Sequence, residues 1–66
     1  MKELILKIAE YIALEHDYFM ALEEIEILNR SQDYEQAAKV RVKARDIFDE
    51  LQKVRSEVSE LREKFE

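Results

Sequence analysis

Residues 37–65 read AAKVRVKARDIFDELQKVRSEVSELREKF, and this stretch decides the fold of the chain. Apolar residues recur through it at alternating steps of three and four, with no polar residue among them. The members of this seam are Ala37, Val40, Ala44, Ile47, Leu51, Val54, Val58, Leu61 and Phe65. Such spacing places them on one face of an α-helix, as in the a and d positions of a coiled coil. The pattern predicts one long helix over about 34–65.

The first half of the chain is also predicted to be helical, over about 2–29, but its apolar face is wider. Two overlapping seams fit it equally well. One consists of Leu4, Ile8, Tyr11, Glu15, Tyr18, Leu22 and Ile25, and the other of Met1, Ile5, Ile8, Ile12, Glu15, Phe19 and Leu22. A face this wide needs more than one partner helix. We therefore expect Ile5, Ile12 and Phe19 to form an interface between copies of the chain.

A polar stretch, NRSQD over 29–33, separates the two predicted helices. Asp33 is a suitable N-cap, with Gln36 three residues later, and Asn29 could adopt the left-handed conformation that often ends a helix. A turn over about 30–33 would make residues 1–66 a single hairpin domain. Because the chain has no Gly or Pro to enforce the break, one continuous helix stays an alternative.

The expected fold is therefore all-α: an antiparallel, coiled-coil-like hairpin that pairs with a second copy as a four-helix bundle. Folding back at Ser31 would oppose acidic residues of the first helix to basic residues of the second. Asp17 would face Arg45, and Glu23 would face Lys39. The apolar faces would meet in the same register, so charge and hydrophobicity favour the same topology.

The composition excludes several functional classes. The 66 residues contain no Gly, Pro, Cys or Trp, so glycine-rich phosphate loops, disulfides and thiolate metal sites are ruled out. With 16 acidic and 11 basic residues the net charge is −5, which does not suit phosphate neutralisation over the whole surface. The longest apolar stretch, residues 4–14, contains Lys7 and Glu10 and is too short to span a bilayer. A cytoplasmic location without membrane contact is expected, since a signal-peptide pattern is also lacking.

Potential catalytic and metal-binding side chains do not form a recognisable constellation. Glu15, His16 and Asp17 are adjacent on a helix and point in different directions, so they cannot bind one ion together. Glu15 interrupts both seams, and we interpret it as a carboxylate at the edge of the core that pairs with Lys43 or Arg45. We therefore predict no catalytic, cofactor-binding or metal-binding residues and no enzymatic activity.

Basic residues cluster only over 39–45. At about 100° per residue, Lys39 and Lys43 lie on one side of the seam and Arg41 and Arg45 on the other. Acidic residues of the first helix should neutralise most of this charge within the hairpin. Nucleic-acid binding is therefore not expected.

The segment DYEQAAKVR over 33–41 resembles the UVR motif, which reads acid, aromatic, Glu, any residue, Ala, Ala, any residue, aliphatic, Arg. This motif occurs in subunits of bacterial nucleotide-excision repair and in Clp-type ATPases and their partners, where it opens the second helix of an antiparallel hairpin. The residue after the Arg is usually Asp but is Val42 here, and residues 1–18 show no resemblance. The likeness implies partner contacts through the matching residues Tyr34, Ala37, Ala38 and Arg41. Because Ala37 and Ala38 are small, we also expect both to let the first helix approach closely at the turn.

These observations favour a non-catalytic interaction module or small adaptor. If the UVR resemblance holds, it implies a Clp-type ATPase or a repair subunit as the protein partner. One alternative is a small acidic regulator of phage type that masks a basic surface of a larger protein. Another is a ligand binder at an oligomer interface. An acidic regulator would bind in a salt-sensitive way, whereas an adaptor that uses Tyr, Phe and Leu would not.

Overall fold

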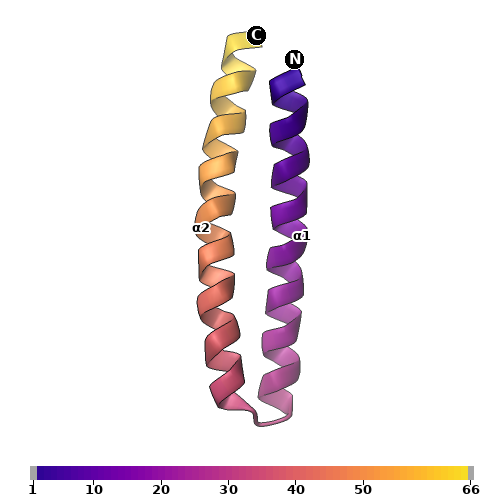
Figure 1. Cartoon of the computed structure of the whole chain (residues 1–66), viewed down its shortest axis with the longest axis vertical. Helices are drawn as coiled ribbons and strands as arrows, with labels where there is room; N and C mark the ends of the chain where they lie inside the picture. Colours follow the sequence, from indigo (N-terminus) through magenta and orange to yellow (C-terminus); the bar gives the residue numbers. More distant parts are fainter. Residues whose placement is uncertain (1, 66) are drawn as a thin grey trace.

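A computed structural model of the chain describes residues 2–65, and the side chains of residues 2–64. It consists of two long helices, α1 (Lys2–Arg30) and α2 (Tyr34–Phe65), joined by residues 31–33. The helices run antiparallel and side by side, with both ends of the chain at the same end of the rod (Figure 1). The rod measures 49 × 14 × 13 Å. The predicted helical hairpin is therefore confirmed, and the alternative of one continuous helix is wrong.

The predicted seam of α2 faces α1. Its buried members are Ala37, Val40, Ala44, Leu51 and Val54. Ile47, Val58 and Leu61 are half-buried on the same face, and the side chain of Phe65 lies outside the described residues. The seam was predictable because every apolar residue in it stands where a period of 3.5 residues requires one.

The buried face of α1 includes Leu4, Tyr11, Tyr18 and Ile25 of the first predicted seam, but it follows neither seam throughout. The side chains that turn towards α2 are Leu4, Lys7, Tyr11, Leu14, Tyr18, Ala21, Ile25 and Leu28. Both predicted seams omitted Lys7 and Ala21, because one is charged and the other small. The small side chain of Ala21 lets Val40 and Ala44 of α2 come close and complete a buried cluster. Met1, a member of the second seam, lies outside the described residues.

The turn is a helix C-cap followed at once by a helix N-cap. The amide of Gln32 donates to the carbonyl of Asn29 (3.1 Å), and the amide of Asp33 donates to that of Leu28 (2.9 Å). These two bonds form a Schellman motif, in which the residue at the C′ position is left-handed. That residue is Gln32, with φ of 61°, so the assignment of Asn29 to this conformation is wrong. In this motif the left-handed position lies directly before Asp33. The residue there is Gln32, and not a Gly or an Asn that would have marked the position in the sequence.

Asp33 caps α2 as predicted. Its side-chain Oδ1 accepts from the amide of Gln36 at 3.3 Å, and its carbonyl accepts the first helical bond from the amide of Ala37 at 3.0 Å. Because the loop centres on Gln32 and not on Ser31, the pairing of the helices shifts. Lys7 lies opposite Glu57, whereas a turn at Ser31 would have placed it opposite Arg55.

Replacing Gln32 by Gly should stabilise the hairpin. A side chain costs about 1–2 kcal/mol in the left-handed region, and part of this gain is lost to the greater freedom of Gly in the unfolded chain. We expect Gln32→Gly to raise the free energy of unfolding by about 0.5–1 kcal/mol, measured by urea unfolding. Gln32→Val, which adds a β-branch at the same position, should lower it. A Gly variant no more stable than the Val variant would contradict the left-handed turn.

Candidate interaction surfaces

The residues predicted to bind a partner occupy the turn end of the rod, but not all of them are accessible. Tyr34 is 62% exposed, and Ala38 and Arg41 are also exposed. Ala37 is fully buried between the helices, so a partner cannot contact it. Its small side chain lets α1 approach α2 closely. Ala38 points away from α1 and does not share that packing role, contrary to the sequence-based interpretation.

Arg41 reaches across the hairpin at this end. Its Nη2 donates to the side-chain oxygen of Asn29 at 3.4 Å, near the C-terminus of α1. An acidic partner on the first helix was expected, but none of the described carboxylates lies within ion-pair distance of Arg41. Its guanidinium therefore retains most of its hydrogen-bonding capacity.

A second surface is the apolar side of α1 that α2 leaves uncovered. It carries a row of large side chains that we call the isoleucine row: Ile5, Ile8, Ile12, Phe19 and Leu22. At about 100° per residue, these five lie within a sector of about 100° beside the buried seam. Ile5, Ile12 and Phe19, the predicted interface residues, are 64%, 59% and 59% exposed. The row coincides with the second predicted seam, which α2 does not cover.

The same side of the hairpin carries a row of arginines on α2. Tyr18, Leu22, Arg45 and Phe48 line a shared groove of about 290 Å³ between the helices, and the rings of Tyr18 and Phe48 lie 5.6 Å apart. Residues that are spaced from Phe48 by multiples of seven lie on the same side of α2. The exposed side chains that we call the arginine row are Arg41, Arg45, Arg55 and Arg62. The isoleucine row and the arginine row thus border one face of the rod.

The opposite side of the seam is acidic. Four carboxylates recur there every seven residues along α1, and we call them the acidic row: Glu3, Glu10, Asp17 and Glu24. They line two further grooves, of about 370 Å³ near the chain ends and about 280 Å³ nearer the turn. Beside them on α1 stand Leu6, Met20 and Ile27, each more than half exposed. The hairpin therefore has two chemically different sides.

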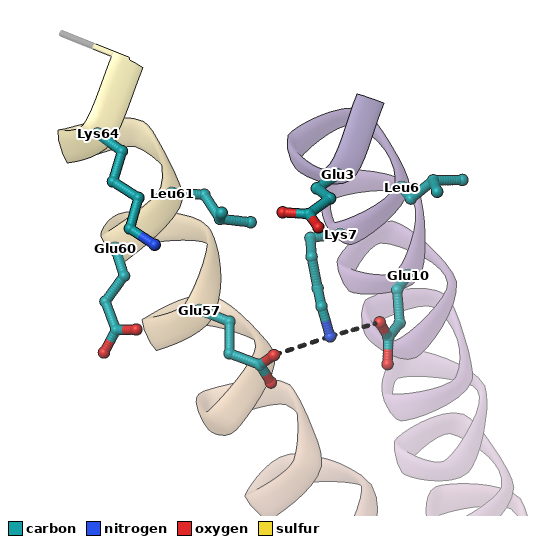
Figure 2. A pocket seen from close by; sticks show the side chains of 8 residues that line it. All are labelled: Glu3, Leu6, Lys7, Glu10, Glu57, Glu60, Leu61 and Lys64. Carbon is teal, nitrogen blue, oxygen red and sulfur yellow. Dashed lines mark hydrogen bonds and ion pairs between the residues drawn. The ribbon is translucent and has the colours of Figure 1, made fainter. Parts of the chain in front are cut away.

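Lys7 connects the helices in the groove near the chain ends. Its Nζ lies 2.8 Å from a carboxylate oxygen of Glu57 and 3.3 Å from one of Glu10. Figure 2 shows the Lys7 side chain extending between the two helices, while Leu6 points away from α2. The hydrogen bond to Glu57 holds the pKa of Lys7 above its usual value, although desolvation opposes this. The same bond holds the pKa of Glu57 below its usual value.

The ion pairs that the sequence predicted across the hairpin do not form. Among the residues that the structure describes, the ion pairs are Lys7–Glu10, Lys7–Glu57 and Glu26–Arg30. Glu15 is half-buried but pairs with neither Lys43 nor Arg45, and Asp17 does not reach Arg45. The reason is that Arg45 stands on the isoleucine side of the seam, whereas Asp17 stands on the acidic side. The arginine row of α2 is therefore not neutralised by acidic residues of α1, although the sequence suggested that it would be.

The Lys7–Glu57 pair should make stability depend on pH at both extremes. The lowered pKa of Glu57 contributes stability above its unfolded value of 4.5, and this is lost as the pH falls through the folded pKa. The raised pKa of Lys7 contributes stability below 10.5, lost as the pH rises through the folded pKa. Glu57→Gln should flatten the acid limb of melting temperature against pH. Glu23→Gln, at an exposed position, should leave that limb unchanged, and equal behaviour of the two variants would contradict the pair.

Neither α1 nor α2 contains a segment that is long and apolar enough to cross a membrane. No group of three or more His, Asp or Glu side chains within residues 2–65 is arranged to hold a metal ion.

The structure defines a two-helix hairpin with exposed apolar and charged side chains on its sides. Comparison with protein-family models, with curated proteins and with solved structures found no match to this chain. The UVR resemblance therefore depends on residues 33–41 alone.

Proposed function

We propose that this chain is a non-catalytic protein–protein interaction module that associates through the exposed side of α1. The observation that carries this proposal is the isoleucine row, whose large apolar side chains α2 leaves in contact with water. Exposed apolar side chains that gather on one side of a small protein are typical of an interaction site. A helix with apolar residues on most of its sides is normally enclosed by several neighbours.

Pairing with a second copy would cover this row and produce the expected four-helix bundle. The small size of the chain favours such association. A chain of 66 residues can build only a small core, which must offset about 1.5 kcal/mol of conformational entropy for each ordered residue. Burial of apolar surface contributes about 25 cal/mol per Å², so covering the isoleucine row would add substantially to stability.

The test is the oligomeric state of a variant that carries Ile12→Glu and Phe19→Glu together. Multi-angle light scattering of the wild-type chain at micromolar concentration should give a dimer or a larger species. The double variant should be a helical monomer, because two carboxylates would have to be buried against apolar side chains. Val42→Glu is the matched control, since Val42 is as exposed as these residues but lies on the outer side of α2.

Two results would contradict this function. A wild-type chain that is monomeric and stably folded at these concentrations would remove the reason for association. A double variant that associates as strongly as the Val42→Glu control would show that the isoleucine row is not the interface.

A second contact, with a different protein, is proposed at the turn end. Tyr34 and Arg41 are accessible there, and an aromatic ring and a guanidinium are frequent at the centres of interfaces. By its resemblance to the UVR motif, this end would serve a Clp-type ATPase or a repair subunit. Arg41→Glu should then abolish capture of purified candidates of these two classes while leaving helicity and melting temperature nearly unchanged. Loss of binding and stability together would mean that Arg41 merely holds the hairpin shut through Asn29.

The alternative function, an acidic regulator that masks a basic surface, draws support from the acidic row. Its seven-residue spacing presents carboxylates along one side of α1. Binding through this side would weaken steeply between low and high salt, because exposed charges are screened within about 8 Å at physiological ionic strength.

A further inference from the structure

The two sides of the hairpin are complementary to each other, and this suggests how one copy meets the next. One side combines the isoleucine row with the arginine row. The other combines the acidic row with the exposed apolar residues Leu6, Met20 and Ile27. Each row follows the heptad repeat of its helix, so two such rows on parallel or antiparallel helices can stay in register along their length.

A symmetric pairing of two isoleucine sides that sets α2 against α2 would be electrostatically unfavourable. It would bring the arginine row of one copy towards that of the other, since both rows border the same face. The half-buried Glu15 and the exposed Glu26 are carboxylates of α1 on this face, and Glu26 is already paired with Arg30. Like charges that are placed opposite each other across an interface cost several kcal/mol.

Contact between unlike sides avoids this repulsion. α1 of a second copy, seen from its acidic side, is an amphipathic helix with carboxylates next to apolar side chains. Placed over the groove that Tyr18, Leu22, Arg45 and Phe48 line, it would set its acidic row against the arginine row. Leu6, Met20 and Ile27 of that copy would pack on the isoleucine row.

We propose that the chain self-associates heterologously: the isoleucine–arginine side of one copy binds the acidic side of α1 of the next copy. This proposal rests on self-association through the isoleucine row and specifies its geometry. A heterologous contact leaves one free side of each kind on every pair. Association therefore continues beyond the pair, into a ring if the rotation closes and into a filament if it does not.

The test uses two variants that reverse the charge of one side each. Arg45→Glu with Arg55→Glu alters the arginine row, and Asp17→Lys with Glu24→Lys alters the acidic row. Circular dichroism first establishes that both variants are helical. By analytical ultracentrifugation, each variant alone should associate at least about tenfold more weakly than the wild type, because like charges now meet. An equimolar mixture should recover association, since the two reversed sides complement each other.

Symmetric pairing makes different predictions. With α2 against α2, the arginine variant would associate as well as the wild type or better, because the repulsion is relieved. In any symmetric pairing of isoleucine sides, the acidic-row variant would associate like the wild type, because the acidic row lies outside the contact. Added salt would strengthen the pairing with α2 against α2 but weaken the heterologous one. Either result for the two variants would overturn the heterologous contact and leave the proposed function intact. A wild-type chain that stays monomeric would overturn both.

Discussion

Leu51→Ala should lower the free energy of unfolding by about 2–5 kcal/mol, the range for a leucine truncated in a well-packed core. Leu51 is 7% exposed and lies midway along the seam of α2, beside the fully buried Val54. Stability of about 0.05–0.15 kcal/mol per residue amounts to about 3–10 kcal/mol for a chain of 66 residues. The substitution therefore removes a large part of the total.

The measurement is urea unfolding followed by circular dichroism at several protein concentrations, which separates folding from association. Val42→Ala truncates a side chain that is 61% exposed on the outer side of α2, and it should cost less than about 0.5 kcal/mol. His16→Ala, at another exposed position, should behave like Val42→Ala. Similar costs for Leu51→Ala and Val42→Ala would mean that the helices face each other differently.

Ala37→Leu should destabilise the hairpin by about 1–3 kcal/mol, because the added atoms have no space between the helices. Ala37 has no exposed surface and lines none of the three grooves described above, so a larger side chain cannot turn into open space. The neighbouring Ala38 is the control, since it is exposed and accepts a larger side chain towards solvent.

The expected result is a clear difference in melting temperature between Ala37→Leu and Ala38→Leu, with the second close to the wild type. From the sequence alone, both alanines of the turn were expected to permit close helix approach. The structure assigns this role to Ala37 because a helix turns by about 100° between adjacent residues. Equal destabilisation by both variants would contradict that assignment.

The buried face of α2 and the position of the turn could be predicted from the sequence, because both depend on local patterns. Apolar residues of the α2 seam recur at heptad spacing, and the polar residues on either side leave one face to bury. Asp33 is a good N-cap in any setting, because its side chain bonds the free amide of Gln36 whatever packs nearby.

The buried face of α1 was decided only in the tertiary structure. Apolar residues occupy most sides of this helix, so its own pattern does not select a face. The selection depends on α2: Ala21 fits where Val40 and Ala44 approach, and Lys7 fits where Glu57 can pair with it. The same choice leaves the isoleucine row exposed next to the arginines of α2. Neither helix alone reveals that these two rows share a side, because their relative placement is a property of the packed pair.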